Sequence, residues 1–155
     1  MKIISLYLLR WALGLLFIAT AVGKLLDNRG FADILQNYRL FPTLILLPLG
    51  LLLSLSELIL GIELIRQPKP FWPSWGIFLM NLGYAVLAAV TNLRGLNLNN
   101  CGCFGVFWAR PMTWNTVTED IILTAVSFAF CILLSHKTKE PYFSKGYPNE
   151  IKTPI

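Results

Sequence analysis

Four long apolar stretches dominate this sequence of 155 residues. They run from about Ile3 to Val22, from Leu44 to Ile65, from Trp72 to Leu93 and from Ile121 to Leu134. A helix needs about 20 apolar residues to cross the hydrocarbon core of a bilayer. The first three stretches reach that length, and each predicts a transmembrane helix.

The fourth stretch is shorter, but the residues before it predict an earlier helix start. Thr116-Val-Thr-Glu119 has the spacing of a capping box, which satisfies the free amides at the beginning of a helix. The box predicts a helix from near Val117 to near Ser135, which is long enough to span the membrane.

The composition excludes an ordinary soluble domain. Hydrophobic residues make up 55% of the chain and charged residues only 14%, whereas soluble domains carry about a quarter charged residues. We therefore expect an all-α membrane protein, a four-transmembrane-helix bundle over residues 1–135. Residues 136–155 are polar and contain three prolines, and they predict a cytoplasmic tail.

Two connections have distinctive sequences. Pro68, Pro70 and Pro73 cannot continue a helix and predict a tight turn between the second and third spans. Between the first and second spans, apolar residues from Phe31 to Leu40 recur at helical spacing among polar ones. This amphipathic pattern predicts a short helix at the membrane interface.

A cleaved signal peptide is an alternative interpretation of the first span. Ala19-Thr20-Ala21 resembles a small-residue cleavage site after a charged start. Cleavage would leave three spans and place the two ends on opposite sides. Arg10 interrupts the apolar core that a signal peptide needs, so we favour a permanent span.

The Lys and Arg residues predict the orientation. With four spans both termini share one side, and 8 of the 13 basic residues fall on that side. These eight are Lys2, Arg10, Arg66, Lys69, Lys137, Lys139, Lys145 and Lys152, and the other five are Lys24, Arg29, Arg39, Arg94 and Arg110. The positive-inside rule then places the termini in the cytoplasm of a multi-pass inner (plasma) membrane protein. Because the basic residues do not gather on one face, we expect no nucleic acid partner.

The segment Cys101-Gly102-Cys103 carries the strongest chemical signal. It lies in the loop from Arg94 to Asn115, which the orientation places outside, where disulfides can persist. Cysteines at i and i+2 approach closely only in a turn, and Gly102 permits one. A disulfide between them would close a small, strained ring, which favours exchange with other thiols. We interpret Cys101 and Cys103 as candidate catalytic residues.

Other interpretations of these cysteines remain open. Arg94 and Arg110 would favour a thiolate, whereas Glu119 and Asp120 would oppose one, so the sequence does not fix the thiol pKa. Both cysteines could also be unreactive, or each could pair with a partner protein.

We expect no metal site, because tetrahedral zinc needs four ligands. The remaining candidates, Cys131 and His136, fall near the far end of the fourth span, and Cys131 is expected to be a packed core residue.

A second group of polar residues is expected inside the membrane. Arg10 and Glu57 fall at similar depths, about 10 and 12 Å from the same end of two antiparallel spans. Since charges in hydrocarbon are unfavourable, we expect them to face each other, with Asn81 nearby. They could bind a headgroup or a cofactor, relay protons, or only fix the helix register. Lys24 is expected to extend toward the interface.

Taken together, these segments resemble the MauE methylamine-utilisation family within the wider DoxX-like group of four-helix membrane proteins. The resemblance covers about Leu9 to Leu134. It rests on Arg10-Trp-Ala-Leu-Gly14, Gly23-Lys24-Leu25, Pro42, Glu57 with Gly61 and, above all, Cys101-Gly-Cys-Phe-Gly105.

The resemblance implies a role in forming disulfides in exported proteins, as the family does for the disulfide-rich small subunit of methylamine dehydrogenase. It also suggests likeness to vitamin K epoxide reductase-type enzymes, which pass electrons to quinone. Those enzymes have Cys-x-x-Cys and a second cysteine pair. The present Cys-x-Cys therefore suggests a thioredoxin-like redox partner.

Two other functions remain open beside a thiol–disulfide oxidoreductase. One is a non-enzymatic assembly or stability factor in which the cysteines are incidental. The other is a quinone-binding subunit centred on Glu57.

Overall fold

The computed structural model describes residues 2–137, with side chains from residue 5 to residue 135. Most of the predicted tail therefore lies outside the described residues. The helices are α1 (Lys2–Leu26), α2 (Asn28–Asn37), α3 (Thr43–Arg66), α4 (Phe71–Leu93) and α5 (Trp114–Lys137). The described part of the chain contains no strand. The predicted all-α class is therefore confirmed.

Four of these helices, α1, α3, α4 and α5, are long and apolar enough to cross a membrane. They match the four predicted spans, and α2 is the predicted short helix between the first two. A tight turn with Pro68 and Pro70 joins α3 to α4, as expected, but Pro73 lies in the first turn of α4, where proline is tolerated. The sequence therefore predicted every helix of the described chain.

The predicted start of the last helix is wrong. α5 begins at Trp114, so Thr116 lies in the first turn instead of capping it. The Thr116 hydroxyl donates to the carbonyl oxygen of Pro111 (2.9 Å), and Glu119 pairs with Arg110. The capping-box residues thus bond to the preceding loop, which lets the helix begin earlier.

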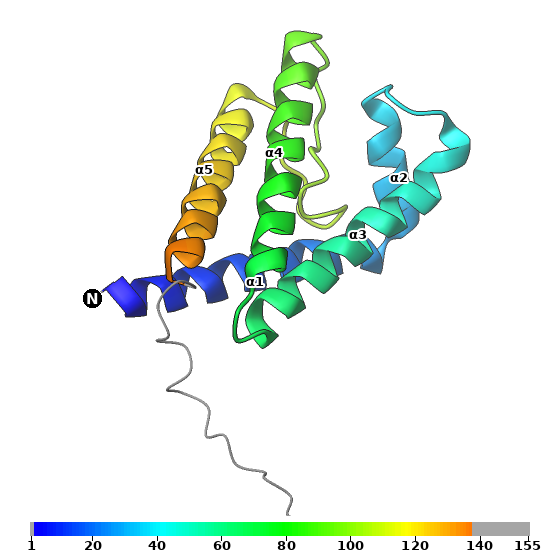
Figure 1. The fold of residues 1–155 in the computed structure, drawn as a ribbon. Helices are drawn as coiled ribbons and strands as arrows, with labels where there is room; N and C mark the ends of the chain where they lie inside the picture. The colour runs from blue at the N-terminus through cyan, green and yellow to red at the C-terminus, as the bar shows by residue number, and fades with distance from the viewer. Residues whose placement is uncertain (1, 138–155) are drawn as a thin grey trace, which may run out of the picture.

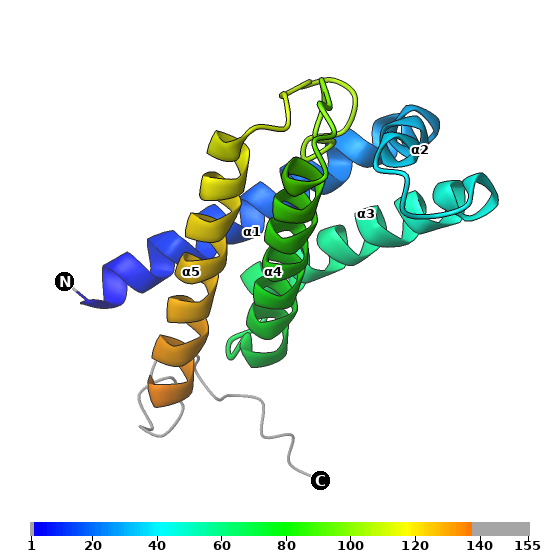
Figure 2. The same ribbon diagram turned by 90° about the horizontal axis from the view of Figure 1, so that it is seen from above.

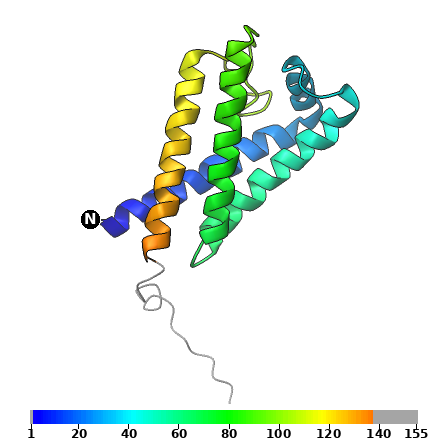
Figure 3. The ribbon, with the colours of Figure 1, turned by 45° about the horizontal axis from the view of Figure 1, so that its top comes forward.

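The long helices form two antiparallel pairs. α1 packs mainly against α3, and α4 packs mainly against α5. The α1/α3 pair crosses the α4/α5 pair obliquely, and the loop between α4 and α5 lies at the opposite end from the α3–α4 turn (Figures 1 and 3). The view from above shows the same crossing (Figure 2).

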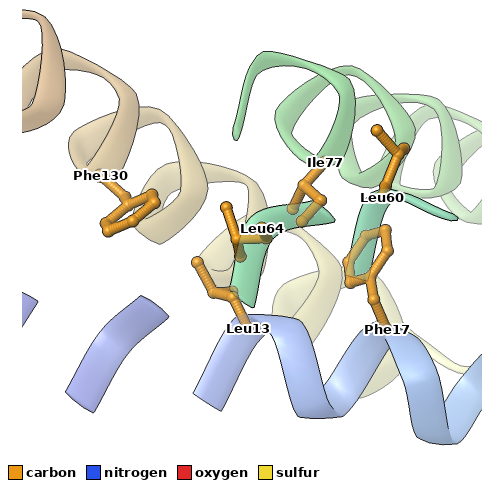
Figure 4. Close-up of a cluster of buried hydrophobic side chains, with 6 residues drawn as sticks. All are labelled: Leu13, Phe17, Leu60, Leu64, Ile77 and Phe130. Carbon is orange, nitrogen blue, oxygen red and sulfur yellow. The ribbon is translucent and has the colours of Figure 1, made fainter. Parts of the chain in front are cut away.

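An apolar cluster joins the two pairs where they cross. Figure 4 shows its six buried side chains, which come from all four long helices: Leu13, Phe17, Leu60, Leu64, Ile77 and Phe130. Within a bilayer such close packing, rather than water exclusion, holds helices together. The cluster therefore fixes the angle at which the two helix pairs cross.

Small residues allow α1 and α3 to approach closely. A Cβ on Gly61 would lie 2.9 Å from the carbonyl oxygen of Gly14, so the two backbones meet at these glycines. Gly83 of α4 differs, because an added Cβ there would meet nothing within 4 Å.

The short helix α2 covers the end of the fold that carries the cysteines. The side chain of Asp27 caps it by accepting the backbone N–H of Gly30 (2.9 Å). Its apolar residues Phe31 and Ile34 are buried, as is Tyr38 directly after the helix. The apolar face of α2 therefore contacts the protein itself.

The loop between α4 and α5 folds back toward α2. The backbone N–H of Met112 donates to the carbonyl oxygen of Leu98, and that of Cys101 donates to the carbonyl oxygen of Arg110, each at 2.8 Å. These two bonds hold the outgoing and returning halves of the loop together. The Cys101–Gly105 segment is thereby held next to α1 and α2.

Candidate functional site

The two cysteines lie in a tight turn, as predicted. Gly102 has φ +74°, a left-handed conformation that residues with a side chain rarely adopt. The turn brings the backbone N–H of Cys103 to 3.4 Å from the sulfur of Cys101. Both cysteines are free thiols in this structure. The spacing thus permits contact between residue 103 and the sulfur of residue 101.

Asn100 and Tyr38 hold this turn in place. The side-chain oxygen of Asn100 accepts the backbone N–H of Gly102 (2.9 Å), and its amide donates to the carbonyl oxygen of Gly105 (3.2 Å). The hydroxyl of Tyr38 donates to the carbonyl oxygen of Cys101 (2.6 Å). Burial raises the pKa of Tyr38, so this hydroxyl stays protonated and remains a donor.

Sequence reasoning assigned neither residue to the site. For Asn100 a signal existed, since asparagine commonly bonds to the backbone two residues further on in a turn. Tyr38 offered none, because its contact with Cys101 depends on the fold of the intervening chain.

The thiols have unequal acidity. The pKa of the Cys101 thiol is lowered to about 7, chiefly because the Cys103 thiol donates a hydrogen bond to its sulfur; burial opposes this shift. The backbone N–H of Cys103 and the guanidinium of Arg110 also favour the Cys101 thiolate, whereas Asp120 disfavours it. The pKa of Cys103 is raised because its thiol is the donor and is buried. Cys101 is therefore the more nucleophilic sulfur near neutral pH.

A buried ion pair lies between α1 and α3. The ammonium of Lys24 and the carboxylate of Glu57 are 2.5 Å apart, and the residues are only 2% and 1% exposed. The Tyr84 hydroxyl also donates to Glu57, and the Thr20 hydroxyl lies 3.3 Å from its second oxygen. Glu57 is thus surrounded by donors from α1 and α4.

The expected pairing of Arg10 with Glu57 is wrong. Arg10 instead donates to the carbonyl oxygens of Leu64 (2.7 Å), Ile65 (2.5 Å) and Gln67 (2.5 Å) at the end of α3. Gln67 follows Glu57 by ten residues, or about 15 Å along a helix. The depth argument failed because α1 extends past the end of α3, so equal counts from the two ends do not mean equal depth.

The expectation for Lys24 is also wrong. We expected its ammonium to extend toward the interface, but it is buried against Glu57. In the observed register Thr20 faces Glu57, and Lys24 follows one turn later on the same face of α1. A helical side chain points back toward the N-terminus of its helix, so Lys24 reaches the same carboxylate.

One cavity of about 440 Å³ joins the ion pair to the cysteines. Lys24, Glu57 and Tyr84 line it, and so do Cys101 and Cys103. Most of its other walls are apolar, with contributions from all five helices and from the loop. The structure thus places a dithiol and a buried ion pair around one space.

The remaining predicted residues divide into two groups. Asn81 lines the cavity, where its amide donates to the hydroxyl of Ser127 (2.8 Å). Arg10 does not line it. Cys131 is fully buried in α5 and outside the cavity, as expected for a packed core residue. Glu57 and Asn81 thus share a cavity with the cysteines, whereas Arg10 serves a helix end.

Comparison with known proteins identifies the family. The family described as "Methylamine utilisation protein MauE" matches residues 1–135, which is most of the chain. This chain belongs to the MauE family. The resemblance stated from the sequence motifs is thereby confirmed, over a slightly longer range than expected.

Individual MauE proteins support the same assignment. The methylamine utilization protein MauE of Paracoccus denitrificans is 31% identical over 124 residues, covering 80% of this chain and 67% of the relative. MauE of Paracoccus versutus is 29% identical, covering 82% of this chain and 70% of the relative. MauE of Methylorubrum extorquens is 26% identical, covering 77% and 64%. No solved structure matches significantly.

Within this MauE-family fold, two motifs that are distant in the sequence meet. The segment Gly23-Lys24 of α1 contacts Phe104 and Gly105 of the loop. A Cβ on Gly23 would lie 2.5 Å from the carbonyl oxygen of Phe104, and one on Gly105 would lie 2.9 Å from the backbone nitrogen of Lys24. The cysteine loop therefore rests on the backbone of α1 beside the buried lysine.

Proposed function

We propose that this MauE-family membrane protein exchanges disulfides through Cys101 and Cys103 and so supports disulfide formation in exported proteins. The supporting observation is the turn itself. It directs the N–H of Cys103 to the sulfur of Cys101 (3.4 Å) and lines a cavity with both residues. The lowered pKa of Cys101 adds a thiolate near neutral pH.

The proposed reaction consists of two thiol–disulfide exchange steps. A client thiolate attacks Cys101 of the oxidised pair, a client–Cys101 disulfide forms, and Cys103 leaves with the electron pair as a thiolate. A second client thiolate then attacks the client sulfur and releases Cys101. The client has lost two electrons and two protons, and the Cys101–Cys103 pair has gained them.

The proposed reaction requires a defined location and a partner. The termini would lie in the cytoplasm and the cysteine loop outside the plasma (inner) membrane, where clients are exported. A thioredoxin-like protein would reoxidise the pair by the same exchange. The relatives are named for methylamine utilization, so the client would be an exported protein of that process, such as the small subunit of methylamine dehydrogenase.

Trapping of a mixed disulfide tests this proposal. In Cys103→Ser, Cys101 can still attack the disulfide of a redox partner, but no Cys103 thiolate is present to release that partner. The partner should therefore stay bonded to Cys101 and be released by reductant. The serine hydroxyl can still donate to the Cys101 sulfur, so the nucleophile is kept. Cys131→Ser is the matched control, because Cys131 is buried away from the cavity, and it should trap nothing. Absence of any covalent partner, under oxidising and reducing conditions alike, would contradict the proposal.

A quinone-binding subunit is the second candidate, and the cavity favours it. A quinone needs an apolar space for its ring and donors for its carbonyl oxygens. The cavity offers about 440 Å³ with mainly apolar walls. The Asn81 amide lies at those walls, and it has a second N–H beside the one donated to Ser127. When bound, a quinone would accept the two electrons of the cysteine pair. Quinone-dependent reoxidation of the purified, reduced protein would support this candidate.

A non-enzymatic assembly factor predicts a different result. The double variant Cys101→Ser, Cys103→Ser would then retain the function in cells, whereas loss of the Lys24–Glu57 pair would abolish it. The oxidoreductase proposal predicts that the double serine variant is inactive.

A further inference from the structure

The buried Lys24–Glu57 pair lies at the wall of the cavity that also contains Cys101 and Cys103. Its ammonium also lies 5.4 Å from the ring centre of Phe31 and 5.1 Å from that of Tyr84, within the range of cation–π contacts. A buried ion pair frequently contributes little net stability compared with apolar packing. Its location on the cysteine cavity therefore suggests a role beyond joining α1 to α3.

The cysteine loop is held against this pair by backbone contacts. Because Phe104 and Gly105 rest on Gly23 and Lys24, the loop cannot move away from the ammonium without lifting off α1. The side chains of Lys24 and Cys103 then enter the same cavity. In a largely apolar cavity a charge is poorly screened, so each charge affects the other more than in water.

We propose that the buried Lys24–Glu57 pair tunes the reactivity of the cysteine pair, with the Lys24 ammonium stabilising negative charge on Cys103 and Glu57 holding that ammonium at the cavity wall. This inference rests on the proposed exchange function and assigns Lys24 and Glu57 as positioning residues. The charge on Cys103 arises in either direction of exchange while Cys101 is bonded to the partner. The hydrogen bond to Cys101 and burial raise the pKa of Cys103, and the Lys24 ammonium acts in the opposite direction.

Other charged and titratable groups also line the cavity around Cys103. They are Lys24 on α1, Tyr38 after α2, Glu57 on α3, Tyr84 on α4, Cys101 and Arg110 on the loop, and Glu119 and Asp120 on α5. Arg110 and Glu119 pair with each other at 2.8 Å, and their side chains are 38% and 48% exposed. Solvent therefore screens them. Lys24 is the buried cation among these groups.

The thiol pKa of Cys103 provides the test. It is measured in the full-length protein in detergent or nanodiscs, with Cys101→Ser as the background so that residue 101 is uncharged, as in a mixed disulfide. The readout is the rate of iodoacetamide alkylation of Cys103 against pH, determined by mass spectrometry. In this background Lys24→Met should raise the apparent pKa of Cys103. Glu57→Gln should lower it, because the amide oxygen can still accept the hydrogen bond of Lys24 while the opposing negative charge is removed. A shift of about one pH unit corresponds to a rate change of about tenfold below the pKa.

Shifts of opposite sign in the pKa of Cys103 distinguish an electrostatic role of the ion pair from a structural one. A variant that only loosens the helix packing would expose Cys103 in the same way whichever partner is removed. Lys24→Arg, which keeps the charge, should stay near the starting pKa. Lys69→Met makes the same chemical change in the α3–α4 turn at the other end of the fold and should have no effect. If Lys24→Met does not fold, Lys24→Gln can still donate to Glu57 and replaces it.

Two results would overturn the inference: shifts of the same sign for Lys24→Met and Glu57→Gln, or no shift in either. The proposed function fails separately, because it depends on trapping a partner and not on the pKa of Cys103. A trapped partner together with an unchanged pKa would refute the tuning role alone.

Discussion

At the scale of single residues, the contact between Gly23 and Phe104 positions the chemistry. A side chain at position 23 would place its Cβ 2.5 Å from the carbonyl oxygen of Phe104, closer than carbon and oxygen can approach. Backbone atoms cannot rotate away as a side-chain end can. The absence of a side chain at Gly23 therefore lets the loop rest on α1, and Lys24 follows directly in the sequence.

Gly23→Ala should displace the cysteine loop from α1. The added methyl group requires a backbone shift, and overpacking of this kind destabilises a protein by about 1–3 kcal/mol. We expect a lower midpoint of thermal unfolding in detergent, and faster alkylation of the buried Cys101 as the loop separates from α1.

Gly83→Ala is the control within the same chain. Its added methyl would meet nothing within 4 Å, and alanine favours a helix over glycine by about 1 kcal/mol. This variant should be as stable as the unchanged protein or more so, with an unaltered alkylation rate. Equal behaviour of the two variants would refute the proposed role of Gly23.

The cysteine turn could be predicted from neighbouring residues, but the ion pair could not. Cys101, Gly102 and Cys103 interact locally, so their spacing was enough. Lys24 is near the end of an apolar stretch, where a lysine can reach the interface or turn inward with equal ease. Only the register of α1 against α3 decides between these, and that register depends on packing between residues far apart in the sequence.

At the scale of helices, hydrogen bonds from Arg10 join α1 to the C-terminal end of α3. The last carbonyl groups of a helix lack partners within it and need donors from elsewhere. The Arg10 guanidinium supplies hydrogen bonds to three such groups, at Leu64, Ile65 and Gln67. This is the end of the fold opposite the cysteines, so Arg10 contributes to stability and not to the site.

Arg10→Met should therefore destabilise the fold without changing the cysteines. A buried acceptor that loses its partner costs about 1–3 kcal/mol, so a clear decrease in the thermal unfolding midpoint is expected. The alkylation rate of Cys103 should stay the same at temperatures where the variant is folded.

Arg66→Met serves as the comparison, because Arg66 is exposed in the last turn of α3. Surface substitutions usually change stability by no more than about 0.5 kcal/mol. An effect of Arg10→Met as small as that of Arg66→Met would show that the hydrogen bonds to α3 are dispensable.

Helix positions were more predictable than helix contacts. Long apolar stretches identified α1, α3 and α4 to within a few residues, because the length needed to cross a bilayer is a property of each segment alone. The start of α5 was misplaced because Thr116 and Glu119 bond to the loop. That alternative partner is not visible in a local motif.

At the scale of the whole molecule, orientation determines whether the chemistry is possible. The count of basic residues includes Arg10 and Lys24, yet both are buried and bonded within the protein. Leaving out one residue from each side keeps seven against four, so the predicted orientation, with the termini in the cytoplasm, does not depend on these two residues. The cysteine loop, at the opposite end from the α3–α4 turn, would then face the oxidising side (Figure 3).

Labelling of intact cells with a membrane-impermeant maleimide tests this orientation. Cys103 is the more exposed thiol and Cys101, at 7% exposure, carries more thiolate near neutral pH, so labelling of either cysteine from outside after mild reduction would place the loop there. Cys131 is fully buried and should react only after denaturation, which provides an internal control. Because the pKa of Cys101 is about 7, its labelling should rise as the pH increases through that value, where the thiolate becomes the main form. Labelling of both Cys101 and Cys103 only after the cells are opened would place the pair in the reducing cytoplasm, where a disulfide donor for exported proteins could not work. The four-helix fold would be unaffected.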